Sequence, residues 1–205
     1  MTAYADFTND FPRRCLEVLD AVSSGAAANG REITLLFMSS SARFLVPFER
    51  LKSDTSNSEH PFGDNKRYGT AAARSKDMLR KKFVGSVLCP SNSHSWHCAK
   101  KVASVECGLD SWLPNTDLKA FSKDRQVASI LTLFRNALAH GNIYTVDDPI
   151  RELAFVKEVT SKQANMTCKR VGFEVIRVSH EDFLRFIRAW LGFWQDPAEC
   201  AGSQP

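Results

Sequence analysis

The sequence predicts a mainly α-helical domain with a small β-hairpin placed just before its last helix. Apolar residues recur at helical spacing in several separate stretches, most clearly over residues 123–140. The pattern changes to alternation in two short stretches, 153–159 and 172–178, as expected for strands with one buried face. The chain has 205 residues, of which 43% are hydrophobic and 24% charged, which is the composition of an ordinary globular domain.

Two helices are predicted in the N-terminal part of the chain. The first is capped at Asn9 or Asp10 and ends near Gly25. The second covers residues 31–51, and Pro47 kinks or shortens it because proline cannot continue a helical ladder. Residues 52–69 are rich in Ser, Asn, Asp, Gly and Pro, which predicts a mobile loop within the domain.

The middle of the chain contains three more predicted helices. Residues 70–84 and 96–107 show helix-forming composition and spacing. The helix over residues 123–140 ends at Gly141, a residue that readily adopts the left-handed conformation of a helix stop. Its predicted core face consists of Val127, Ile130, Leu131, Phe134, Ala137 and Leu138.

The C-terminal part combines the hairpin with a final helix. The stretches 153–159 and 172–178 are expected to pair as antiparallel strands. Ser179 and Asp182 then form a capping box that opens the last helix. We expect residues 1–197 to form one domain, followed by a polar tail.

Composition narrows the classes of function without choosing among them. No apolar stretch approaches the ~20 residues of a membrane-spanning helix, and residues 1–14 are polar where a signal peptide is apolar. We therefore expect a cytoplasmic protein that does not contact a membrane. The chain has 27 Lys and Arg against 23 Asp and Glu, and this net charge of +4 permits a polyanionic partner without requiring one.

Six cysteines occur without any Cys-x-x-Cys pair, so reduced thiols are expected in a chain with no secretion signal. One local group has the residue types that bind zinc, namely Cys89, His94, His97, Cys98 and Cys107. Its spacing matches no finger or ribbon. Buried cysteines beside a histidine-bearing loop are the alternative interpretation, and we predict a protein without metal or cofactor.

Polar residues gather where the helix over 123–140 ends. The run there is Arg135, Asn136, Ala137, Leu138, Ala139, His140, Gly141 and Asn142. At ~100° per residue, Arg135 and His140 point about 140° apart, whereas Asn136 and His140 are neighbours on one side of the helix. One interpretation makes Arg135 a cover for the helix stem and His140 a cap for free carbonyls. The other makes this edge a site for a bound anion.

The run RNALAH followed by GN resembles the Arg-x4-His motif of the HEPN superfamily (higher eukaryotes and prokaryotes nucleotide-binding domains). Its context is similar, because a long second helix precedes the motif helix and a terminal helix follows it. The order of motif, hairpin and a VSHEDFLRFIRAW helix resembles prokaryotic HEPN proteins found on plasmids and in defence or toxin-like settings. This resemblance implies a HEPN-like helical bundle and a metal-independent endoribonuclease in which two protomers build one composite cleft.

The resemblance assigns roles to individual residues. Arg135 is the motif arginine and would bind the scissile phosphate through its planar guanidinium group. His140 would carry the proton, and Asn136 would orient His140 or hold the phosphate. The 2′-hydroxyl of RNA would then attack its own phosphate and leave a 2′,3′-cyclic end. Asn142 stands where some toxins of this superfamily have a modifiable tyrosine, and it is a candidate for binding the RNA substrate. Tyr144 is expected to pack or to line the rim.

Residues outside the motif supply further candidates for binding RNA. Arg43 is a polar break in the second helix, and Lys81 and Lys82 belong to a basic cluster. For each of them a solvated surface position is the alternative. Trp96 lies in a polar stretch and is the candidate for stacking on a base, whereas Trp190 has core spacing.

Together these observations predict a dimeric HEPN ribonuclease that acts in toxin–antitoxin systems or antiviral defence. Its expected partners are RNA, a second copy of the chain, and an antitoxin or regulatory protein. The alternative is a non-catalytic HEPN domain that binds a nucleotide, a nucleic acid or a protein, because fold and motif do not by themselves establish turnover.

Overall fold

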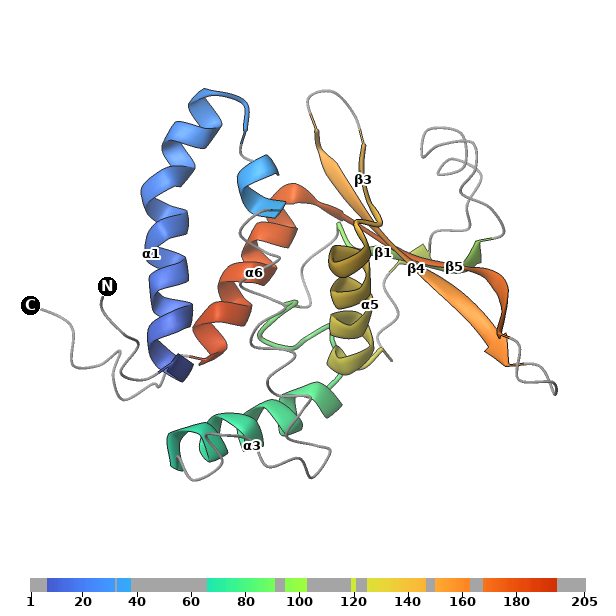
Figure 1. The fold of residues 1–205 in the computed structure, drawn as a ribbon, viewed down its shortest axis with the longest axis horizontal. Coiled ribbons are helices and arrows are strands. Elements are labelled where there is room, and N and C mark those ends of the chain that lie inside the picture. Colours follow the sequence, from blue (N-terminus) through green and yellow to red (C-terminus); the bar gives the residue numbers. More distant parts are fainter. Residues whose placement is uncertain are drawn as a thin grey trace, which may run out of the picture. The chain divides into compact units, whose positions relative to one another are not determined.

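A computed structural model shows the chain divided into two compact units (Figure 1). One unit comprises Met1–Lys81 and Leu184–Pro205, and the other comprises Lys82–Phe183. In the described residues, the first unit is helical and the second contains a β-sheet. The structure describes residues 7–31, 33–37, 66–90, 95–102, 119–120, 125–146, 150–162 and 168–194.

The first unit contains α1 (Phe7–Ala28), α3 (Lys66–Arg80) and most of α6 (His180–Trp194). The first predicted helix exists as α1, but it begins at Phe7 and ends at Ala28, so Asp10 lies within its first turn and the predicted cap and end are wrong. Within the stretch 31–51, residues 33–37 are helical and residues 38–51 lie outside the described part. Because α3 begins at Lys66, the last residues of the predicted loop are helical, and the helix predicted to reach residue 84 ends at Arg80.

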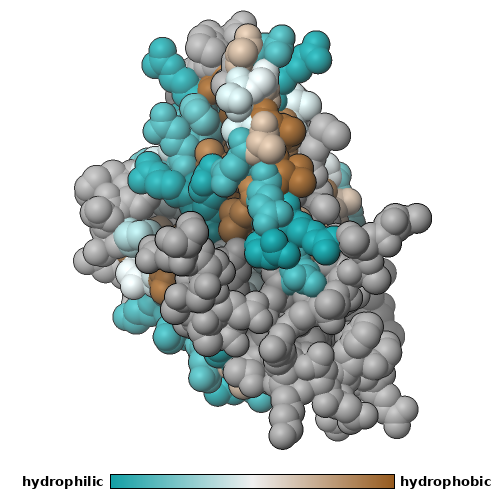
Figure 2. Space-filling model, turned by 90° about the vertical axis from the view of Figure 1, so that its left-hand side faces the viewer, coloured by the Kyte–Doolittle hydropathy of each residue, from teal (hydrophilic) through white to brown (hydrophobic). Residues whose placement is uncertain are grey.

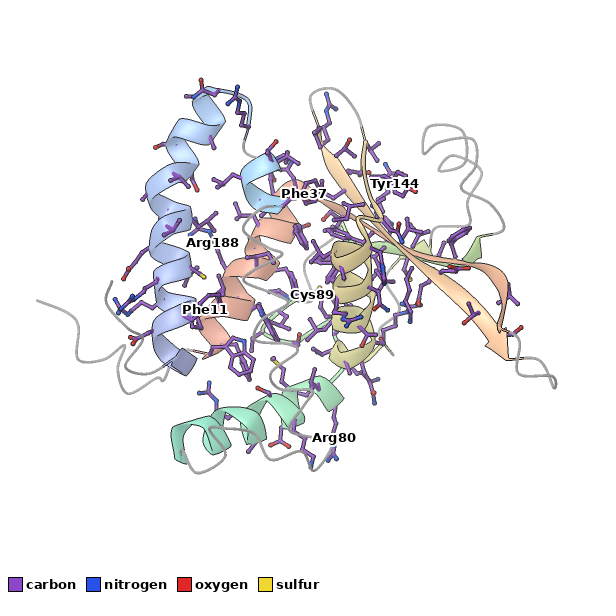
Figure 3. All side chains as sticks on the ribbon, viewed as in Figure 1. Phe11, Phe37, Arg80, Cys89, Tyr144 and Arg188 are labelled. Carbon is purple, nitrogen blue, oxygen red and sulfur yellow. The ribbon has the colours of Figure 1, made fainter. Side chains whose placement is uncertain are left out.

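Within this unit, α1 is tied to α6 by Arg188, which donates a hydrogen bond to the Asp20 carboxylate at 2.5 Å (Figure 3). Leu19 is buried, whereas Val18 and Val22 remain 55% and 41% exposed. Figure 2 views the side on which α1 lies in Figure 1, and it shows apolar side chains among polar ones there. The helix therefore buries only part of its apolar surface among the described residues.

The second unit is built on a five-stranded antiparallel sheet, and its strand order is β2-β1-β5-β4-β3. The prediction of a mainly α-helical bundle with a small hairpin is therefore wrong. Of the described residues, 56% are helical and 28% are in strands. The strands are β1 (His97–Val102), β2 (Lys119–Ala120), β3 (Ile143–Val146), β4 (Glu152–Lys162) and β5 (Cys168–Ser179).

The sheet is larger than predicted because it also contains β1, β2 and β3, and because the hairpin is longer. The predicted hairpin exists as β4 and β5, but it is longer at both ends, with Glu152 opposite Ser179 and Lys162 opposite Cys168. The stretch 96–107, predicted as a helix, provides β1, and its residues 103–107 lie outside the described part. β1 pairs with β5, which is distant in sequence, so local periodicity could not reveal it.

One face of the sheet packs against α5 (Val127–His140), which confirms the helix predicted over residues 123–140 from Val127 onward. The ring of Phe134 lies 4.7 Å from that of Phe155 on β4 and 5.5 Å from that of Phe183 at the start of α6. Trp96 is only 3% exposed, and its ring lies 5.9 Å from Phe134. The expectation that Trp96 stacks on a base is therefore wrong, because this side chain belongs to the core.

The other face of the sheet carries a second apolar cluster. Val146, Ala154, Val156 and Val175 are buried there, and Tyr144 packs against them (Figure 3). Since both faces of the central strands are apolar, β4 has a firm position between two layers of buried side chains. The residues that follow α5 form β3, which pairs with β4.

The start of α6 confirms the predicted cap. The hydroxyl of Ser179 accepts a hydrogen bond from the backbone N–H of Asp182 at 3.2 Å. The same hydroxyl donates to Ser95 at 3.1 Å, and Ser95 donates to the Asp182 carboxylate. Trp190 is fully buried, as its spacing predicts. In the part of the chain that is described, no helix is long and apolar enough to cross a membrane.

Candidate functional site

The N-terminal end of α5 is fixed to the sheet by buried polar contacts. Arg125, which lies two residues before the helix, forms an ion pair with Glu174 on β5, and its side chain is only 7% exposed. The carbonyl of Arg125 also accepts a hydrogen bond from the N–H of Phe83 at 2.7 Å. The sequence analysis missed Arg125 and Glu174, because nothing local to either residue indicates a partner so far along the chain.

The C-terminal end of α5 is fixed by its backbone. Gly141 adopts φ 68°, and the N–H of Asn142 donates to the carbonyl of Ala137 at 2.9 Å, which closes the last turn. The carbonyl of Asn142 accepts a hydrogen bond from the N–H of Val156 on β4 at 3.0 Å. The turn after His140 is therefore attached to the middle of the sheet, while the His140 side chain is exposed.

Arg135 and Asn136 interact directly one turn before this end. Nη1 of Arg135 donates to Oδ1 of Asn136 at 3.0 Å, and both side chains are half-buried. Asn136 and His140 lie on the same side of the helix, being four residues apart. The Cα positions of Arg135 and His140 are about 140° apart around the helix axis. The hydrogen bond to Asn136 nevertheless holds the guanidinium toward the side of Asn136 and His140. The motif thus forms one polar edge.

The remaining candidates are placed differently. Asn142 follows His140 directly and is half-buried. Lys82 is exposed and bridges by its backbone to Gln126, at the opposite end of α5 from His140. The length of the helix separates these two ends by ~20 Å. Lys81 is exposed and belongs to the other compact unit, and Arg43 lies outside the described residues.

The cysteine and histidine group is only partly described. Burial, and then the charge of Asp182, raises the pKa of the Cys89 thiol to about 12, so this side chain is a neutral thiol near neutral pH. Cys98 is also buried, whereas His94 and Cys107 lie outside the described part. Among the described residues, no three His, Cys, Asp or Glu side chains lie close enough together to hold a metal ion.

Comparison with known proteins gives a family match. A family model described as HEPN pEK499 p136 matches residues 1–197, which include the sheet, α5 and α6. Searches of curated proteins and of solved structures found no match. The family match confirms the resemblance to the HEPN superfamily.

Proposed function

We propose that this chain, which belongs to the HEPN pEK499 p136 family, is a metal-independent endoribonuclease. Proteins of the HEPN type are commonly ribonucleases or nucleotide-related. The observation that supports the finer proposal is the polar edge at the end of α5, where Arg135 and Asn136 interact one turn before an exposed His140. A proton carrier and a cation beside it are the two groups that metal-free RNA cleavage needs.

The reaction begins with the 2′-hydroxyl of RNA as its internal nucleophile. His140 takes the proton from this hydroxyl as its oxygen forms a bond to the adjacent phosphorus. The bond from phosphorus to the 5′-oxygen of the next nucleotide breaks, and that oxygen receives a proton. The products are a 2′,3′-cyclic phosphate and a 5′-hydroxyl, and no water or metal is consumed.

Arg135 stabilises the negative charge that accumulates on the phosphate oxygens during this displacement. The hydrogen bond to Asn136 limits the orientations of the guanidinium before RNA binds, so less conformational freedom is lost in the transition state. The guanidinium presents its donors in a planar fork, which suits two phosphate oxygens better than an ammonium group does. Asn136 therefore acts as a positioning residue for Arg135.

A second copy of the chain completes the site in this proposal. One imidazole must both take and give a proton, whereas two imidazoles across a two-fold axis divide these tasks. Mixed dimers of wild type with His140→Ala should then have far less than half of the wild-type activity. Activity of about half would show that each protomer works alone. We also propose that the protein acts in toxin–antitoxin systems or antiviral defence, and that an antitoxin or a regulatory protein is its partner.

The deciding experiment incubates the purified full chain with total RNA in chelator and maps the new ends. Cleavage with 2′,3′-cyclic ends is expected for the wild type, and cleavage slowed by roughly 10²–10⁴ is expected for His140→Ala. His180→Gln is the matched control, because His180 contacts the Arg151 carbonyl outside the motif, and it should remain active. Activity that disappears in chelator and returns with magnesium or zinc would overturn the mechanism. Binding without cleavage would favour the non-catalytic alternative.

A further inference from the structure

We propose that the outer ends of β4 and β5, residues 157–162 and 168–171, form a basic arm that binds the phosphate backbone of RNA beside the α5 motif. This inference rests on the proposed function and adds a substrate-holding surface outside the catalytic residues. The basic arm lies in the same compact unit as α5, so its relation to the motif is defined.

The basic arm extends beyond the rest of the sheet. On one side, β3 pairs with β4 only as far as Phe155. On the other side, β1 pairs with β5 only as far as Phe173. The pairing of β4 with β5 continues to Lys162 and Cys168, so among the described strands this part is a two-stranded ribbon (Figure 1).

Charge is concentrated on this ribbon. Residues 157–162 and 168–171 contain four basic residues, Lys157, Lys162, Lys169 and Arg170, against one acidic residue, Glu158, in a chain whose net charge is +4. A two-stranded ribbon gains little stability from its own pairing, and like charges at neighbouring positions of a ribbon repel one another. A polyanion is the partner that would relieve this repulsion.

A bulge changes which face of the ribbon carries the basic positions. Val159 lies opposite Gly172 and Thr160 lies opposite Arg170, so Val171 is an extra residue on β5. Gly172 has φ 144°, a conformation that glycine adopts without strain. Beyond the bulge, position 169 lies opposite Ser161 and shares a face with positions 157 and 155.

That face is the one on which α5 lies, because Phe155 packs against Phe134 of the helix. Positions 157 and 169 therefore lie on the same side of the sheet as the motif helix, whereas positions 162 and 170 lie on the other side of the ribbon. Val156, the residue just before the basic arm, donates its N–H to Asn142 of the motif turn. From Val156, β4 runs ~20 Å to Lys162, so one RNA strand can contact both the motif and the arm.

The residue types indicate what part of RNA the basic arm contacts. Residues 157–171 include no aromatic side chain that could stack on a base. Lysine and arginine bind phosphates irrespective of sequence. The basic arm should therefore raise affinity for RNA without changing the bases at which cleavage occurs.

The test measures binding of a labelled single-stranded RNA to the full chain in the His140→Ala background, where cleavage is expected to be slow. The arm variant is Lys162→Gln/Lys169→Gln/Arg170→Gln. Its matched control removes three exposed positive charges elsewhere, Arg31→Gln/Lys76→Gln/Arg80→Gln. The slope of log affinity against log salt should become shallower by about 2 in the arm variant only. Between 50 and 200 mM salt, the parent should lose about 20-fold more affinity than the arm variant.

Circular dichroism and the melting temperature verify that the variants fold, and a charge-conserving variant, Lys162→Arg/Lys169→Arg/Arg170→Lys, should bind like the parent. An unchanged slope in the arm variant, or an equal change in the control, overturns the proposal. If the arm variant loses binding to polyglutamate but keeps its binding to RNA, the proposal is also overturned, and the arm binds an acidic protein instead. A protein that fails to cleave RNA yet shows the predicted change in slope would refute only the ribonuclease.

Discussion

The two halves of α5 serve different purposes. Val127, Ile130, Leu131, Leu133 and Phe134, all within the first eight residues, are fully buried. In the second half only Ala137 is fully buried, and the helix ends at exposed residues and a left-handed glycine. The difference shows that stability and chemistry can occupy successive turns of one helix, so substitutions in the two halves should have separable effects.

The largest expected effect is on catalysis, at the exposed end. His140→Ala should lower the rate of RNA cleavage by roughly 10²–10⁴, which is the usual contribution of a positioned proton carrier. Arg135→Ala should lower it by about 10²–10³. Single-turnover cleavage in chelator measures both effects.

Neither substitution should shift the melting temperature by more than a few degrees, because His140 is exposed and Arg135 is half-buried. Arg135→Lys keeps the charge without the planar fork, and it should have intermediate activity. If the His140→Ala protein folds and remains fully active, the exposed end of α5 has no catalytic role.

The next effect is on stability, in the buried half. Phe134→Ala removes a ring that contacts Phe155 and Phe183, and it should lower the free energy of unfolding by about 3–5 kcal/mol. Urea denaturation followed by tryptophan fluorescence measures this loss. Phe134→Leu keeps most of the volume and should cost less. If Phe134→Ala leaves stability unchanged, α5 does not depend on this contact.

A smaller effect is expected at the junction of helix and sheet. Gly141→Ala should destabilise the protein by about 1 kcal/mol, because an alanine at φ 68° is strained although nothing lies within 4 Å of the added Cβ. Gly192→Ala is the control, since this helical glycine has equal space without the unusual φ, and it should stabilise slightly. Thermal melts of the two variants should therefore shift in opposite directions.

The smallest expected effect on stability near neutral pH is at Cys89. Its thiol is buried and is therefore unreactive, although cysteine is otherwise a reactive residue. An unfolded thiol releases its proton above pH 9.0, whereas the folded thiol keeps it until about pH 12. Stability contributed by the neutral buried thiol is therefore complete below pH 9 and is lost as the pH rises toward 12.

Cys89→Ser, which does not titrate in this range, should show a weaker loss of stability in urea denaturation from pH 8 to pH 11. Alkylation of Cys89 at pH 8 should follow global unfolding, whereas the half-buried Cys15 should react earlier. Rapid alkylation of Cys89 in the folded protein would show that the thiol is accessible.

The elements that sequence analysis predicted correctly are those whose burial is visible locally. The first half of α5 repeats apolar residues every three or four positions, and Ser179 and Asp182 lie at the spacing of a cap, so both features were readable. The order of Arg135, Asn136 and His140 was likewise explicit. The sequence did not predict the hydrogen bond between Arg135 and Asn136, because residues i and i+1 do not face each other on an ideal helix.

The sheet was underestimated because its stabilising contacts are remote. β1 depends on pairing with β5, so the sequence HCAKKV has no local period that distinguishes it from a helix. The outer parts of β4 and β5 are polar on both faces, so alternation stops before the pairing does. Trp96 was misjudged for the same reason, since its buried neighbours Phe83 and Phe134 come from other segments.

The strand order also has a consequence for how the second unit folds. β3, β4 and β5 are consecutive neighbours joined by short connections, whereas Cys98 of β1 pairs with Ile176 far along the chain. Since contacts between distant residues form slowly, we expect the three-stranded meander to assemble first and β1 to join last. Until then the edge of β5 is open to pairing with other chains, so folding at high protein concentration should favour aggregation at this step.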